Sequence, residues 1–268
     1  MVQKIESEKS YICYMTQEKT RYFIFISYKG TSYHGWQIQP NSVTVQELLE
    51  EALSVVLNEK ISTIGAGRTD SGVHATFFCA HFESTSSTLP EISNLVFRLN
   101  KYLPDDISVS SIKKVVADAS ARYSAISRTY KYYISRIKDP FFDNSSWYIH
   151  GNIDVALMNK ACEILFKHLD FTSFSKLHSG SKTNICKIYS SIWAESDNRL
   201  VFTIKADRFL RNMVRAIVGT MVEIGIGKLD LNGFEEIILA NDRCKAGKSA
   251  PAKGLFLVDI EYPEEIFI

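Results

Sequence analysis

The chain has 268 residues, of which 46% are hydrophobic and 23% are charged, and its formal net charge at pH 7 is +1. This length corresponds to one or two domains, and the composition is that of a globular protein, which excludes a largely disordered or collagen-like chain. No stretch reaches the roughly 18 uninterrupted apolar residues of a membrane helix, and residues 1–20 lack the apolar segment of a signal peptide. We therefore expect a cytoplasmic protein that binds no membrane.

The cysteines and histidines do not have the spacing of metal ligands. The five cysteines form no CxxC pair, so the sequence predicts neither a zinc site nor a disulfide framework. His74 and His81 are seven residues apart, so on one strand their side chains would point to opposite faces. We predict no metal site.

The first half of the chain predicts a mixed unit of strands and helices after a flexible leader at residues 1–20. Thr44 and Glu47 form a capping-box pattern, and apolar residues then recur at helical spacing to about Asn58. Alternating apolar, aromatic and β-branched residues predict strands at 21–28, 60–64, 76–83 and 107–116. The predicted helices are 44–58 and 91–101.

The second half approximately repeats this order. It predicts a strand-rich segment at 122–137, strands at 186–194, 200–206 and 255–262, and helices at 154–168, 208–225 and 231–240. We therefore expect an α+β fold of two ferredoxin-like, RRM-like units whose mainly antiparallel sheets form a central cleft. The predicted domains are 21–117 and 118–268, because Ala, Asp and Ser interrupt the apolar rhythm at 117–121.

The segment GAGRTDSGVHA, residues 65–75, is the densest candidate for chemistry. It is not a nucleotide-binding loop, because Asp70 stands where GxGxxG needs a glycine and no lysine follows Gly72. The glycines can instead present Asp70 beside Arg68 as a nucleophile or base. Spacing alone favours a turn in which Asp70 caps backbone groups. An acid–base pair of Asp70 and His74 acting on a small molecule is a further alternative.

Residues 121–136, ARYSAISRTYKYYISR, interleave cations with tyrosines. Cations bind phosphates and tyrosine rings stack on unpaired bases, so this composition suits RNA. A half-buried strand with a basic outer face explains the composition equally well.

The predicted helix at 208–225 has an apolar stripe and an opposite face carrying three arginines. At about 100° per residue, Arg208, Arg211 and Arg215 fall within about 60° of one another. Gly219 lies on the same face and costs about 1 kcal/mol against alanine, which suggests that something approaches the helix closely there. The alternative is a solvated polar face on a core helix.

Six motifs together resemble the tRNA pseudouridine synthase A family over about residues 21–263. They are GRTDSGVHA, R-x-Y-x-Y (Arg128, Tyr130 and Tyr132), FLRNMVRAIVG, APAKGLFLVDIEY, the segment at 27–53 and LNKYLPDDI at 99–107. The chain departs from the family pattern at Thr76, Phe77 and Phe78, and it has Arg211 where some relatives have histidine. Both departures are expected to alter RNA contacts.

The resemblance implies an isomerase that converts uridine to pseudouridine at positions 38, 39 and 40 of tRNA. It implies a homodimer and no cofactor, because the reaction involves no redox change, hydrolysis or group transfer. By the same resemblance, Asp70 is the nucleophile, Arg215 pairs with it, Tyr130 packs on the target uracil and Arg68 fills the gap left by the flipped nucleotide. Further candidates for RNA contact are Arg128, Arg208 and Arg211. A non-catalytic α+β RNA-binding module remains the alternative.

Overall fold

The computed structural model describes residues 19–85, 89, 91–176 and 182–268, so almost all of the predicted leader lies outside the described residues. The strands are β1 (Thr20–Tyr28), β2 (Thr63–Gly65), β3 (His74–Ser84), β4 (Ile107–Lys114), β5 (Ser127–Ser135), β6 (Trp147–Tyr148), β7 (Ile188–Ser196), β8 (Arg199–Ala206) and β9 (Leu255–Glu261). The α-helices are α1 (Val45–Leu57), α2 (Ile92–Tyr102), α3 (Val155–Leu165), α4 (Met213–Gly225) and α5 (Leu231–Leu239). None of the described helices is long and apolar enough to cross a membrane.

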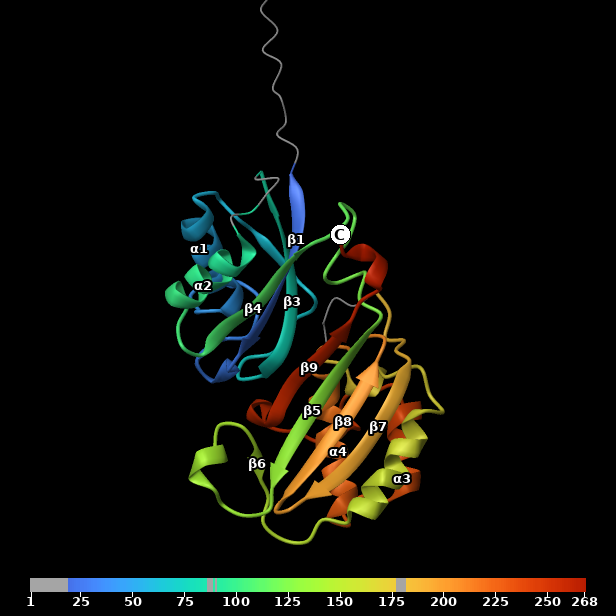
Figure 1. Cartoon of the computed structure of the whole chain (residues 1–268). Coiled ribbons are helices and arrows are strands. Elements are labelled where there is room, and N and C mark those ends of the chain that lie inside the picture. The colour runs from blue at the N-terminus through green and yellow to red at the C-terminus, as the bar shows by residue number, and fades with distance from the viewer. Residues whose placement is uncertain (1–18, 86–88, 90, 177–181) are drawn as a thin grey trace, which may run out of the picture.

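These elements confirm the predicted α+β class, and they show that the two halves share one sheet. The strand order is β4-β1-β3-β9-β5-β8-β7, with β2 beside β3 and β6 beside β5 (Figure 1). The last strand joins the halves, because β9 pairs in parallel with β3 and antiparallel with β5. The central strand of the sheet is therefore the last one in the chain.

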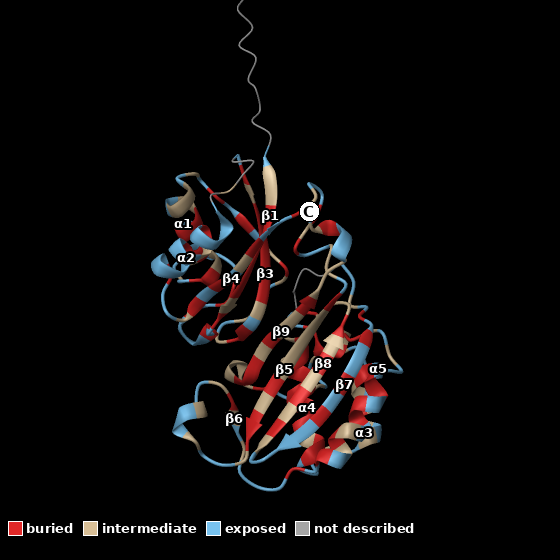
Figure 2. Ribbon diagram, viewed as in Figure 1, coloured by how far each residue is buried: buried red, intermediate tan, exposed pale blue. Residues whose placement is uncertain are grey.

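Each half of the sheet has its own hydrophobic core. One cluster lies around β1, β3, β4, α1 and α2, and the other lies among β5, β7, β8 and helices α3, α4 and α5, as the buried stretches in Figure 2 indicate. Ile260 and Ile266, near the C-terminus, belong to the cluster of the first half. The domain boundary at 117/118 remains a prediction.

The start of α1 shows how local sequence sets an element. Thr44 has an extended backbone conformation, and its hydroxyl oxygen accepts a hydrogen bond from the backbone N–H of Glu47 at 3.4 Å. This bond satisfies one of the free N–H groups of the first turn. The apolar residues that follow at helical spacing face the core, and Leu49 and Leu53 are fully buried. The predicted N-terminus of this helix is confirmed.

Helix α4 begins five residues later than predicted. The prediction that Arg208, Arg211 and Arg215 share one face of this helix is therefore wrong. Asn212 has a φ of +67°, a left-handed conformation that cannot continue a helix backwards. Leu210 is buried although it precedes the helix, which explains why the apolar pattern extends to residues before Met213. Arg208 and Arg211 lie in the loop before α4, and only Arg215 is on the helix. The face opposite the apolar stripe is also buried along most of α4.

Gly219 allows a loop of the protein itself to lie against α4. A Cβ at this position would be 1.8 Å from the carbonyl oxygen of Lys248, so an alanine needs the backbone of that loop to move. We expect Gly219→Ala to lower the free energy of unfolding by about 3 kcal/mol, a value typical of overpacking. Gly67→Ala is the matched control, because nothing lies within 4 Å of its Cβ. Urea unfolding measures both, and equal midpoints would contradict the prediction.

Candidate active site

The tertiary structure brings Asp70 to Arg215, 145 positions further along the chain. Asp70 lies in the loop 66–73 between β2 and β3, and Nη1 of Arg215 is 3.1 Å from its Oδ2 atom. The Nε atom of Arg215 also donates to the carbonyl oxygen of Ala250 at 2.8 Å, and the Ala250 N–H donates back to the Arg215 carbonyl. The guanidinium is thus oriented by a second contact before it meets the carboxylate.

Arg211 is a second cation beside the same carboxylate. Its Nε atom is 3.8 Å from Oδ1 of Asp70, and 46% of its side chain is exposed, against 20% for Arg215. An exposed ion pair at this distance contributes little free energy, because water screens it. The two arginines therefore differ in kind: Arg215 is held in place, whereas Arg211 is only loosely paired.

The loop that carries Asp70 rests on residues 28–36. The hydroxyl of Tyr28 is 2.9 Å from Oγ1 of Thr69, and the carbonyl of Thr69 accepts from the Trp36 N–H. Gly35 has a φ of +91°, and a Cβ there would be 2.4 Å from the Thr69 carbonyl oxygen, so only glycine fits. Sequence reasoning did not assign a role to these residues, although Gly30, Gly35 and the aromatic residues beside them mark a close approach of backbones.

Tyr130 comes from β5 and lies near enough to Asp70 for the charge of the carboxylate to act on its hydroxyl. It is half-buried, and its ring meets the edge of Phe209 at a centroid distance of 5.1 Å. Burial raises the pKa of Tyr130 to about 12, the Arg128 guanidinium lowers that pKa, and the Asp70 carboxylate raises it. The hydroxyl is therefore neutral at physiological pH.

Arg128 ties three segments of the site together. Its Nη1 atom donates to the carbonyls of Ala125 and Asp207, and its Nη2 atom donates to those of Ala66 and Arg122, at distances of 2.5–3.2 Å. Burial lowers the pKa of this guanidinium. Because its terminal nitrogens already serve backbone carbonyls, the geometry assigns Arg128 an internal role, and its contact with RNA remains a prediction.

The other two predicted arginines make no ion pair with Asp70 in the described part of the chain. Arg68 is exposed two residues before Asp70, and its side chain has no hydrogen bond with described residues. Arg208 is half-buried in the loop before α4, where its backbone N–H donates to Oδ1 of Asp207. The site thus combines Asp70, Arg215, Arg211 and Tyr130.

The departures from the family pattern after GVHA serve mostly in packing. Phe78 is fully buried, and its ring centroid is 4.3 Å from that of Trp36. Phe77 is half-buried against Phe25, and only Thr76 is exposed. The Phe78 side chain lies in the core of the first half, and the effect of the three departures on RNA contacts remains a prediction.

His74 is used by a neighbouring loop and not by Asp70. Its Nδ1 atom accepts a hydrogen bond from the Gly30 N–H at 3.1 Å. Its ring stacks on that of Phe256, with the two ring centroids 4.5 Å apart. Burial lowers the pKa of His74, which favours the neutral ring. Within the described residues no hydrogen bond joins His74 to Asp70, so the geometry does not support an acid–base pair of the two.

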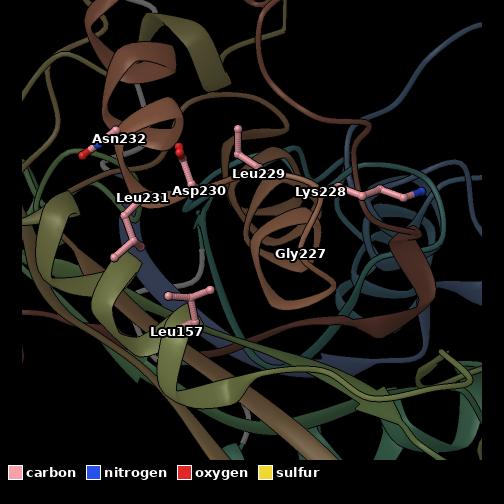
Figure 3. Close-up of a pocket in the computed structure, with 7 residues that line it drawn as sticks. All are labelled: Leu157, Gly227, Lys228, Leu229, Asp230, Leu231 and Asn232. Carbon is pink, nitrogen blue, oxygen red and sulfur yellow. The ribbon is translucent and has the colours of Figure 1, made fainter.

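A pocket elsewhere in the second half does not compete with this site. It is formed by the segment between α4 and α5 together with α3, and Figure 3 shows its lining residues: Leu157, Gly227, Lys228, Leu229, Asp230, Leu231 and Asn232. The carboxylate of Asp230 caps the start of α5 by accepting from the Gly233 N–H at 2.7 Å. The pocket contains none of the four residues of the site, Asp70, Arg215, Arg211 and Tyr130.

Comparisons with known proteins identify the family of this chain. A family model described as tRNA pseudouridine synthase matches residues 24–124 and 162–263, which include Asp70 and Arg215. A chain named tRNA pseudouridine synthase A from Parabacteroides distasonis is 52% identical over 92% of this chain and 98% of its own length. The relative of that name from Bacteroides fragilis is 53% identical over 92% and 98%, and that from Caldicellulosiruptor bescii is 41% identical over 88% and 97%. The chain therefore belongs to the tRNA pseudouridine synthase family, and it is an isomerase.

Proposed function

We propose that the chain converts uridine to pseudouridine at positions 38, 39 and 40 of the tRNA anticodon stem-loop. The observation that carries the proposal is the contact of the Asp70 carboxylate with a guanidinium that the Ala250 carbonyl already orients. A carboxylate held in this way is suited to act as a nucleophile. A non-catalytic RNA-binding module would have no use for this arrangement.

The reaction rearranges one nucleoside without adding or removing atoms overall. Asp70 attacks either C6 of the uracil or C1′ of the ribose, and the bond between N1 and C1′ breaks. The uracil turns, and C5 forms the new bond to C1′ while N1 takes up a proton. The proton on C5 is lost, and the carboxylate of Asp70 is released, so the electrons balance without an oxidant or reductant.

Side chains near Asp70 can offset the free energy that is needed to extrude a base from a stem. Extruding a nucleotide from a stack costs a few kcal/mol. Stacking on an aromatic ring contributes about 1–3 kcal/mol per base, and Tyr130 offers such a ring beside Asp70. Arg68 is exposed close to Asp70, where it can occupy the space that the extruded base leaves.

The Tyr130 ring is expected to matter more than its hydroxyl. Tyr130→Phe keeps the ring face, whereas Tyr130→Ala removes the platform for the uracil. We expect the alanine variant to lose at least about tenfold more activity than the phenylalanine variant. Single-turnover rates measure the difference, with thermal melting as the control for folding. Equal losses in both variants would instead assign the hydroxyl to proton transfer.

Release of tritium from C5 tests the reaction and its position together. We would prepare tRNA transcripts labelled at C5 of uridine, each with a single uridine among positions 38, 39 and 40. Release from each transcript is expected, and a transcript with cytidine at all three positions is the control. Absence of release from all three, with tRNA still bound, would contradict the proposed positions.

The same proposal includes a homodimer that acts in the cytoplasm. The homodimer is what the family resemblance implies. Two copies would hold one tRNA across both chains. Sedimentation of the full chain with and without tRNA tests the assembly. We expect a particle of twice the chain mass, and a monomer at micromolar concentration would contradict it.

A further inference from the structure

A turn at residues 120–124 lies beside the Asp70 loop, although the two are far apart in the sequence. The connection is the Nη2 atom of Arg128, which donates to the Arg122 carbonyl at 2.5 Å and to the Ala66 carbonyl at 3.2 Å. Because one nitrogen reaches both carbonyls, the turn and the start of the loop 66–73 are neighbours.

The turn is held in shape by its own hydrogen bonds. The Ser124 N–H donates to the Ser120 carbonyl at 2.9 Å, and the Ser120 N–H donates to the Ser124 hydroxyl at 2.9 Å. The Tyr123 N–H donates to the hydroxyl of Ser120 at 3.3 Å. The Tyr262 hydroxyl also donates to the carbonyl of the buried Ala121 at 2.6 Å. The backbone that presents Tyr123 is therefore fixed on both sides.

The side chain of Tyr123 is exposed to solvent. It is 80% exposed, and the guanidinium of Arg122 lies over its ring at 5.3 Å from the centroid. An aromatic ring paired with a guanidinium offers two flat groups on which a nucleobase stacks, and the cation adds attraction to the adjacent phosphate. Neither hydrophobic cluster of the described residues includes this side chain.

We propose that Tyr123 and Arg122 form a stacking platform for an unpaired base of the RNA substrate, next to the uridine that enters the Asp70 site. This inference rests on the proposed function, because it places the target uridine at Asp70. The turn adjoins the start of the loop that carries Asp70, because Arg128 holds the two segments together. The platform makes the enzyme bind substrates in which a base beside the target is free to leave its stack.

The test compares Tyr123→Ala with Tyr123→Phe and Tyr123→Trp in the full chain. The affinity for an anticodon stem-loop RNA is measured, together with the fluorescence of 2-aminopurine placed on either side of the target uridine. We expect the alanine variant to bind about tenfold more weakly and to lose the quenching of one 2-aminopurine, whereas the two aromatic variants keep both. Phe141→Ala is the matched control, because Phe141 is another aromatic residue that is 93% exposed, and it is expected to bind normally.

Three results would overturn the platform. They are normal affinity and quenching in Tyr123→Ala, a loss in Tyr123→Phe as large as in the alanine variant, and an equal loss in Phe141→Ala. Because Tyr123 is exposed, its removal is not expected to unfold the chain, and the melting temperature checks this. If the wild-type chain binds the RNA but releases no tritium from C5, the proposed function fails, and the binding data still judge the platform separately.

Discussion

Asp70→Asn is expected to abolish pseudouridine formation while leaving tRNA affinity almost unchanged. The amide keeps the shape of the carboxyl group but removes its negative charge, and with it the nucleophile. Phosphate contacts made by other residues dominate affinity for RNA, so binding does not depend on this charge. We expect the single-turnover rate to fall by more than about 1,000-fold, which corresponds to roughly 4 kcal/mol of activation free energy.

Asp143→Asn is the matched control for this variant. Asp143 is also a carboxylate in an ion pair, with Lys253 at 2.9 Å, but its side chain is 68% exposed and it lies outside the site. Its removal is expected to leave the rate unchanged, because exposed ion pairs contribute little. A pure Asp70→Asn preparation that works within about tenfold of the wild-type rate would defeat the assignment of Asp70 as nucleophile.

Replacement of Arg215 by methionine is expected to lower the single-turnover rate, whereas replacement of Arg211 is expected to change the salt dependence of tRNA binding. Arg215→Met leaves a partly buried carboxylate without its oriented partner, so the single-turnover rate at saturating tRNA is expected to fall at least about 100-fold. Its salt dependence of binding stays that of the wild type. Arg211→Met is expected to reduce the slope of log affinity against log salt by about one unit, because an exposed arginine is free to bind a phosphate.

Salt titrations of tRNA binding, run beside single-turnover measurements, separate the two arginines. Near-normal chemistry in Arg215→Met together with a flatter salt slope would mean that Arg215 binds phosphate and does not serve Asp70. A large loss of single-turnover rate in Arg211→Met would mean that its 3.8 Å contact with Asp70 persists in the complex with RNA.

Elements whose signals are local can be predicted from the amino-acid sequence. Thr44 and Glu47 predicted the start of α1, and period-two patterns located most strands of the sheet, because caps and strand periodicity depend on neighbouring residues. The glycine-framed Asp70 was also visible as the densest candidate for chemistry. Its spacing alone favoured an ordinary turn, and the family resemblance was needed to choose between the two interpretations.

The start of α4 and the contacts of the arginines depend on tertiary packing. The periodicity extended to residue 208 because Leu210 is buried in the loop by contacts that are distant in sequence. Nothing in the spacing of Arg128 indicates that its terminal nitrogens serve backbone carbonyls from three other segments. A long side chain can reach any acceptor that the fold brings near it, so its partner is not encoded in its neighbours.

The site itself depends on the path of the last strand. Local patterns predict two units, but β9 pairs with β5 of the second unit and also with β3 of the first, and the Asp70 loop directly precedes β3. The segment before β9 carries Ala250, whose carbonyl orients Arg215 toward Asp70. The paired residues of β3 and β9 are 182 positions apart, so their pairing is set by the packing of two cores and not by any short-range pattern. Only the folded chain therefore brings Asp70, Arg215 and Tyr130 together.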